Sequence, residues 1–193
     1  MLQESEITMK NTTNLPTNYE LKESFDLKDN KENIIIQSIF FIIAGIFVGS
    51  VFLFKLSLSS TLNGLVVALV TVALVLVYMT LHELTHGVFI SLLSKTKSKY
   101  SFRFPFLTTG TAAYLNKTSF IIVCLAPSVV WGIILGIVML FIPNDLRLSF
   151  YILLGLNFAG SAGDYLQVYL VRKFSKSTLI KDDGKTTNIY IEK

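Results

Sequence analysis

Two histidines and two carboxylates carry the charged or imidazole groups of this chain's apolar stretches. His82, Glu83 and His86 lie in the segment Leu-His-Glu-Leu-Thr-His-Gly at 81–87, and Asp164 lies in a later stretch. On a helix, a spacing of four residues places the two imidazoles about 40° apart on one face. Both rings can then reach one metal ion at about 2.0–2.1 Å, as in a zinc site.

Glu83 is offset by about 100° from His82 and by about 60° from His86 around the same helix. That position brings its carboxylate near the metal without making it a ligand, which suits a base that takes a proton from metal-bound water. A catalytic zinc needs a third protein ligand and keeps its fourth position open. Asp164 is the remaining ionisable candidate in the apolar stretches, so we expect His82, His86 and Asp164 to be the ligands and Glu83 the base.

The motif contains both histidines of the chain. A competing interpretation is that these polar residues only bond to one another inside a helical bundle. It would leave Glu83 in lipid without a cationic partner, which is energetically costly. The ligand types favour zinc but are also compatible with iron, cobalt or manganese.

Long apolar helices must position these residues, because 52% of the 193 residues are hydrophobic and the mean hydropathy is +0.58. Four runs approach or exceed the roughly 20 residues of a bilayer span. They are Ile34–Phe54, Leu62–Leu93, Thr118–Ile142 and Leu148–Val171. We therefore expect an all-α polytopic membrane protein with four transmembrane helices. Residues 34–173 would form the membrane domain, residues 1–33 a polar tail and residues 174–193 a basic tail.

Basic residues predict how the chain is oriented in the membrane. Of the 17 Lys and Arg residues, all but Lys55 and Arg147 fall in the N-terminal tail, the loop at 95–117 or the C-terminal stretch at 172–193. The positive-inside rule then places both termini and this loop in the cytoplasm. Attraction to an anionic inner leaflet explains the net charge of +4 without a nucleic-acid partner.

The loop between the second and third spans has a strand-like rhythm. Aromatic residues alternate with other residues from Tyr100 to Phe106, which predicts a short cytoplasmic β-hairpin with its turn at 108–110 and a return strand at 111–115. Such a hairpin can rest on the lipid interface, hold an extended substrate along its edge, or do both. Phe102, Phe104 and Gly110 are therefore candidate substrate-binding residues.

Asn157, Cys124 and Pro127 are further residues of interest in the apolar stretches. Asn157 lies seven residues before Asp164, so its amide is placed either to bond the substrate and a developing oxyanion or to link two helices. Cys124, the only cysteine, is interpreted as a small buried hydrophobic residue. Pro127 is expected to bend the third span, which would open space beside the metal or simply shape the bundle.

The two motifs together resemble a known family. His82-Glu83-Leu-Thr-His86-Gly on one span, with Asn157-x-x-Gly-Ser-x-Gly-Asp164 on a later span, is similar to the site-2 protease class of intramembrane zinc metalloproteases, in particular to its small bacterial zincin-peptidase branch. The resemblance covers about residues 75–170. It implies that His82, His86 and Asp164 bind zinc, that Glu83 is the base, and that the protein lies in a bacterial plasma membrane.

The favoured function is a zinc-dependent membrane endopeptidase that cleaves membrane-anchored proteins or hydrophobic peptides. One alternative is a catalytically silent module of the same fold that binds a peptide or confers immunity to it. A metal transporter is a third possibility, but it would need polar sites along a path, and the first and third spans carry no charged or imidazole side chain.

Overall fold

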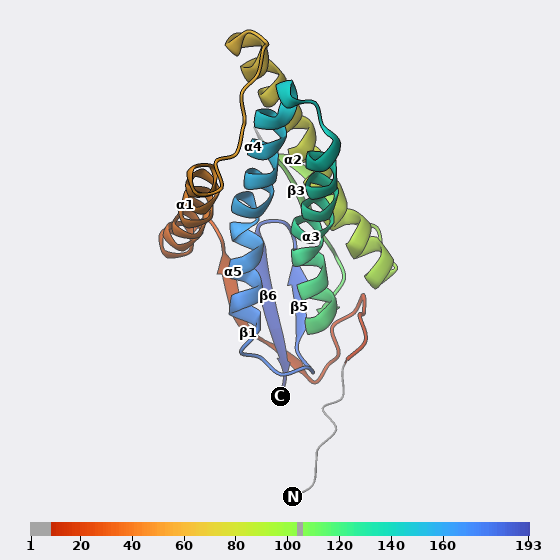
Figure 1. The fold of residues 1–193 in the computed structure, drawn as a ribbon. Coiled ribbons are helices and arrows are strands. Elements are labelled where there is room, and N and C mark those ends of the chain that lie inside the picture. The colour runs from red at the N-terminus through yellow and green to blue at the C-terminus, as the bar shows by residue number, and fades with distance from the viewer. Residues whose placement is uncertain (1–8, 104–105) are drawn as a thin grey trace, which may run out of the picture.

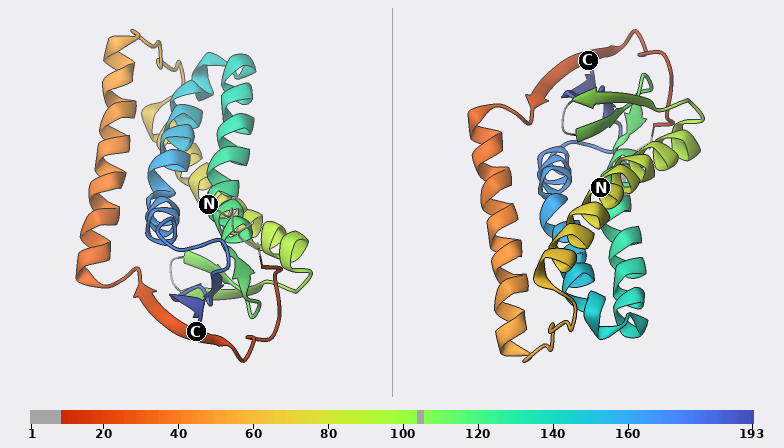
Figure 2. Two further views of the ribbon diagram at one scale, coloured as in Figure 1. Left: turned by 90° about the horizontal axis from the view of Figure 1, so that it is seen from below. Right: turned by 90° about the horizontal axis from the view of Figure 1, so that it is seen from above.

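The computed structural model describes residues 9–103 and 106–193, and it combines a bundle of helices with β-structure at one end (Figures 1 and 2). The helices are α1 Asn30–Leu53, α2 Gly64–Ser94, α3 Lys117–Phe141, α4 Asn144–Gly160 and α5 Ala162–Val171. The strands are β1 Tyr19–Asp26, β2 Lys99–Arg103, β3 Phe106–Gly110, β4 Leu115–Asn116, β5 Leu179–Asp182 and β6 Thr186–Glu192.

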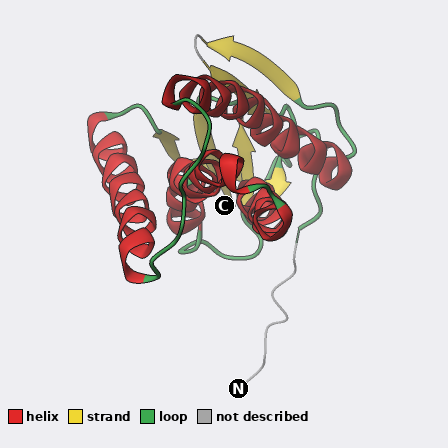
Figure 3. Cartoon of the chain, turned by 45° about the horizontal axis from the view of Figure 1, so that its top comes forward, coloured by secondary structure: helices red, strands yellow, loops and turns green. Residues whose placement is uncertain are grey.

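A four-stranded antiparallel sheet overturns the all-α prediction. Its strand order is β1-β6-β5-β4, and β1 pairs with β6 so that Tyr19 lies opposite Glu192. Three of its strands come from the two segments expected to be tails. Thr187 and Ile189 are buried while Asn188 between them is less so, which is the alternation of a strand with one covered face. Figure 3 shows these strands gathered beside the helices.

Three helices, not four, are long and apolar enough to cross a membrane within the described residues: α1, α2 and α3. The expected fourth span is interrupted at Ser161, which ends α4 and precedes α5. Two causes act there. Gly160 and Gly163 have low helix propensity, and the Ser161 hydroxyl donates a hydrogen bond of 2.8 Å to the carbonyl of Asn157. Such back-bonding bends helices.

The hairpin between α2 and α3 is present, but its predicted turn is wrong. Residues 108–110 belong to β3, which pairs antiparallel with β2 so that Ser101 lies opposite Thr108 and Lys99 opposite Gly110. The Ser101 and Thr108 hydroxyls also lie within hydrogen-bonding distance, at 2.7 Å. Threonine favours strands because its branched side chain packs well on a pleated surface, and this preference prevails over the turn tendency of Gly110.

Two hydrophobic clusters hold α2, one near its C-terminal end and the other at its middle. The first joins one face of the sheet to the ends of α2, α3 and α5; its buried members are Ile90, Leu115, Phe120, Val123, Cys124, Val171, Ile180 and Ile189. The second lies within the bundle and has Tyr78, Leu135 and Leu153 as its buried members. The motif at 82–86 falls between Tyr78 and Ile90, so packing fixes α2 on both sides of it.

Candidate metal centre

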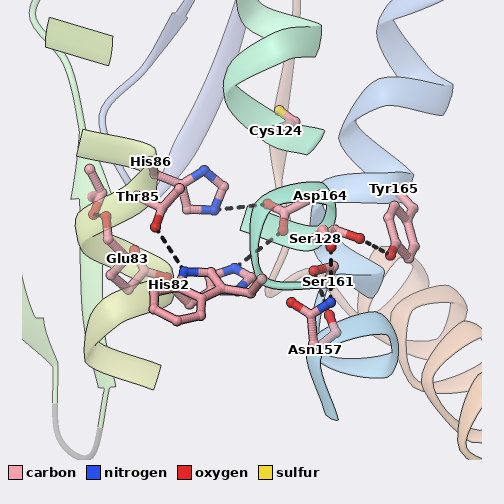
Figure 4. Close-up of polar contacts among 12 residues, drawn as sticks. His82, Glu83, Thr85, His86, Cys124, Ser128, Asn157, Ser161, Asp164 and Tyr165 are labelled. Carbon is pink, nitrogen blue, oxygen red and sulfur yellow. Dashed lines mark hydrogen bonds and ion pairs between the residues drawn. The ribbon is translucent and has the colours of Figure 1, made fainter. Parts of the chain in front are cut away.

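His82 and His86 on α2 face Asp164 in the first turn of α5 (Figure 4). His82 Nε2 lies 3.5 Å from Asp164 Oδ2, and His86 Nε2 lies 3.4 Å from Asp164 Oδ1. The three side chains are only 12–16% exposed. One candidate ligand atom from each lies within 4.8 Å of the other two, so the structure brings together the three residues that the sequence singled out.

These separations fit a tetrahedral metal better than direct hydrogen bonds. Charge-assisted N–H···O bonds are typically about 2.7–2.9 Å long. Two ligands bound to zinc at about 2.0–2.1 Å in tetrahedral geometry lie about 3.3–3.4 Å from each other. The distances from Asp164 to the two rings match that second spacing.

His86 Nδ1, the ring nitrogen that does not face Asp164, bonds to the backbone. His86 Nδ1 lies 2.9 Å from the carbonyl oxygen of Val123 on α3. A carbonyl can only accept, so Nδ1 must carry the proton of the neutral ring. His86 Nε2 then has a free lone pair, and it is this atom that faces Asp164.

His82 reaches the same state through a chain of hydrogen bonds. Asn157 Nδ2 donates to the carbonyl of Ser128, at 2.9 Å, which fixes Asn157 Oδ1 as the acceptor for the Tyr78 hydroxyl, at 2.8 Å. With its only proton donated, the Tyr78 oxygen, 3.0 Å from His82 Nδ1, must accept from that nitrogen. His82 Nε2 is therefore also unprotonated in the neutral ring.

Hydrogen-bonding partners of this kind fix the tautomer and the orientation of metal-binding histidines. Here they turn the Nε2 lone pairs of both neutral rings toward the carboxylate of Asp164. With both rings neutral, such an arrangement is repulsive in a partly buried site, and a metal cation bound between the three groups would remove that repulsion. The donor set of two imidazoles and one carboxylate is one that catalytic zinc sites use.

The hairpin is fixed against α2 at the motif itself. The Thr109 hydroxyl donates a hydrogen bond of 2.9 Å to the backbone carbonyl of Glu83. Gly87 is buried under the hydroxyl group of Tyr100, where any larger side chain would collide. Strand β3 therefore runs directly beside the Glu83 turn of α2.

Two cavities meet at His82 and Glu83. The first, of about 290 Å³, lies toward the sheet and is lined by all three candidate ligands, together with Cys124, Gln167 and Asp182. The second, of about 680 Å³, lies between α1, α2, α4 and the hairpin. Apart from Tyr78, the motif residues and two threonines, its lining is apolar or glycine: Phe40, Val75, Leu76, Met79, Phe102, Leu107, Leu156 and Gly160.

A polar bridge ties α5 to the sheet one turn after Asp164. Gln167 Nε2 donates to Asp182 Oδ2 at 2.9 Å and to the Thr187 hydroxyl at 3.0 Å. Burial raises the pKa of the Asp182 carboxyl, against the opposing effect of hydrogen bonds from Gly184, Thr187 and Gln167. The sheet thereby helps to hold the helix that carries Asp164.

The candidate substrate-binding residues occupy different environments. Phe102 is 69% exposed and lines the larger cavity. Gly110 lines the smaller cavity, and its missing side chain makes room for the backbone of Asp183 and Gly184. Asn157 is completely buried and its amide bonds to Ser128 and Tyr78, so its substrate contact stays a prediction while its observed contacts orient His82. Phe104 lies outside the described residues.

Sequence reasoning did not anticipate Tyr78 or the Val123 carbonyl. Tyr78 had a detectable signal, because a tyrosine four residues before His82 shares its helix face. The Val123 carbonyl had none of its own, since every residue has one.

Comparison with known families identifies the chain's family. A family model described as "Putative zincin peptidase" matches residues 74–179, more than half of the chain, and the chain belongs to this family. The match includes His82, Glu83, His86 and Asp164. No curated protein and no solved structure matches the chain.

Proposed function

We propose that this member of the zincin peptidase family is a zinc-dependent membrane endopeptidase that cleaves membrane-anchored or hydrophobic peptides, with an arrangement similar to that of site-2 proteases. The observation that carries the proposal is the convergence of two imidazole Nε2 atoms and one carboxylate beside Glu83, with the Nδ1 atom of each ring bonded to another group. In this assignment His82, His86 and Asp164 hold the metal.

A zinc ion held by these ligands would supply Lewis acidity that activates water and polarises a peptide carbonyl. Glu83 lines both cavities at their junction, so its carboxylate is placed to accept the proton of the attacking water. The same carboxyl group then returns the proton to the leaving amine. The contacts of Tyr78 and Val123 keep the imidazole protons on the Nδ1 atoms throughout, away from the reacting groups.

The larger cavity is the proposed route for substrate. Its lining from α1, α2 and the hairpin is mostly apolar, as an apolar peptide segment requires. Strand β3 borders this cavity, and its only strand partner in the described chain is β2. An extended peptide can therefore pair with the edge of β3 that has no strand partner. This pairing would place the peptide's carbonyl groups beside Glu83.

The proposed setting is a membrane crossed by α1, α2 and α3, with α4 and α5 together returning the chain to the side of the sheet, which is the cytoplasmic side. The sheet and hairpin contain the N-terminal segment, the 95–117 loop and the C-terminal segment, which are the three basic regions. Their common location at one end of the bundle agrees with the side that the positive-inside rule assigns to them.

The test is a Glu83→Gln variant in proteoliposomes containing quenched-fluorescence peptides that join an apolar segment to a polar tail. We expect cleavage to fall about 10²–10⁴-fold, because proton transfer loses its base. Zinc content should stay at the wild-type level. Equal cleavage by wild type and variant would remove Glu83 from the reaction. Peptide binding without cleavage by the zinc-loaded wild type would favour the catalytically silent module instead.

A further inference from the structure

Pro127 lies inside α3, and its missing backbone proton affects one specific carbonyl. In an α-helix the N–H of residue 127 would donate to the carbonyl of Val123, four residues earlier. Proline has no N–H, and its ring pushes that carbonyl aside. The helix therefore leaves the Val123 oxygen without its usual partner, although Val123 and Pro127 are both buried.

His86 supplies the replacement donor. Its Nδ1 lies 2.9 Å from the Val123 oxygen, which a helical N–H would otherwise occupy. A buried carbonyl without a hydrogen bond is costly, so the vacancy favours the ring position that fills it. The proline and the histidine are thus matched across the α2–α3 contact.

We propose that Pro127 is a positioning residue for His86. By freeing the Val123 carbonyl, it fixes the proton of the His86 ring on Nδ1 and turns the Nε2 lone pair toward Asp164. Free neutral histidine in water favours the opposite tautomer, with its proton on Nε2. The role of this ring as a metal ligand rests on the proposed function, whereas the tautomer itself is a property of the metal-free chain.

His82 provides an internal comparison, because its tautomer is set by different atoms. Its chain of partners runs through Tyr78 and Asn157 to the carbonyl of Ser128. These hydrogen bonds do not involve the Val123 oxygen. Loss of Pro127 should therefore alter His86 and spare His82, whereas loss of the Tyr78 hydroxyl should do the reverse.

The experiment is nitrogen-15 NMR of histidine-labelled, metal-free protein at alkaline pH, where both rings are neutral. The chain has two histidines, and His82→Gln assigns their signals. We expect both wild-type rings to carry the proton on Nδ1. In Pro127→Ala the new N–H competes for Val123, so His86 should shift toward the Nε2-protonated form. In Tyr78→Phe only His82 should shift.

Zinc affinity, measured by competition with a chelator, is the second readout. Loss of a ligand's hydrogen-bonding partner typically weakens metal binding about 10–100-fold, and we expect this for both Pro127→Ala and Tyr78→Phe. Pro143→Ala is the matched control, because Pro143 precedes α4 outside the helical interior. It should change neither the tautomers nor the affinity.

Three results would overturn the proposal. One is a wild-type His86 that carries its proton on Nε2, and this needs no variant to fold. The second is a Pro127→Ala protein in which His86 keeps the Nδ1 proton. The third is an equal change at both histidines, which would mean that Pro127 only shapes α3. An intact tautomer pattern in a protein that cleaves nothing would leave this proposal standing and remove the peptidase assignment.

Discussion

The two cavities that meet at His82 and Glu83 are built in opposite ways. The smaller one is bounded by α2, α3, α5 and the sheet, and polar side chains that line it, such as His86, Gln167 and Asp182, bond to one another or to backbone carbonyls. The larger one is bounded partly by α1, a helix with no buried residue, and by mostly apolar side chains. We infer that rigid packing holds the metal ligands, while a loosely covered apolar groove admits the substrate.

This difference also explains where α1 is fastened. Its Phe47 ring stacks on Phe158, at a centroid distance of 5.9 Å, and contacts Gly155, which has no side chain to hold it away. Ser50 bonds with Tyr151 nearby. Phe40, two turns earlier, lines the groove instead. Contacts with α4 hold α1 around Phe47 and Ser50, and α1 also contacts α5, whereas Phe40 lines the larger cavity.

The largest expected effect on zinc binding and cleavage comes from a substitution in the smaller cavity, which holds the metal ligands. Asp164→Asn replaces the only carboxylate among the three converging ligands. We expect zinc affinity to fall by more than about 100-fold, because loss of a ligand should cost more than loss of a ligand's hydrogen-bonding partner, which costs about 10–100-fold. Cleavage should fall to background. Zinc content by mass spectrometry is the measurement. Asp145→Asn is the control, because Asp145 is not among the converging ligands and bonds instead with Thr61 and Ser60 in the loop before α2. Zinc retained by Asp164→Asn would contradict the ligand assignment.

A smaller effect is expected from the groove. Leu76 lines it and is 59% exposed, whereas Leu69, on the same helix and 63% exposed, is absent from its lining. Leu76→Ala removes apolar contact area with substrate, so KM should rise by roughly 10-fold while kcat and zinc content stay unchanged. Leu69→Ala should leave all three unchanged. Identical kinetics for the two variants would argue against this groove as the substrate route.

The smallest effect concerns the sheet that supports α5. Burial raises the pKa of Asp182 above its ordinary 3.8, so the unfolded chain releases this proton at a lower pH than the folded protein does. Stability should therefore fall as the pH rises from below 3.8 through the folded-state pKa, by about 1.4 kcal/mol for each unit of difference. Asp182→Asn should flatten that dependence in thermal unfolding. If the stabilities of wild type and Asp182→Asn changed with pH in parallel, the pKa of Asp182 would not be raised in the folded protein.

The sequence was most informative where one helix turn sets the geometry. The spacing of His82 and His86 follows from helical periodicity, and the scarcity of other ionisable groups in the apolar stretches singled out Asp164. The family match supports a zincin-type metallopeptidase.

The remaining features depend on long-range contacts that composition does not reveal. Hydropathy averages across the Gly160–Gly163 segment and so could not show that the helix breaks at Ser161. Strands β1 and β6 are largely polar and pair across almost the whole chain, from Tyr19 to Glu192, so neither looked like part of a core. The effect of Pro127 was missed because it depends on which side chain meets the freed Val123 carbonyl.

X-ray absorption spectroscopy at the zinc edge of the purified, zinc-loaded protein tests the centre most directly. The spectrum should show two imidazole rings and oxygen ligands at about 2.0–2.2 Å, with one imidazole fewer in His86→Ala. Sulfur at about 2.3 Å would place Cys124, which lines the same cavity, in the coordination sphere. That result, or a wild-type spectrum with fewer than two imidazoles, would contradict a metal held by His82, His86 and Asp164.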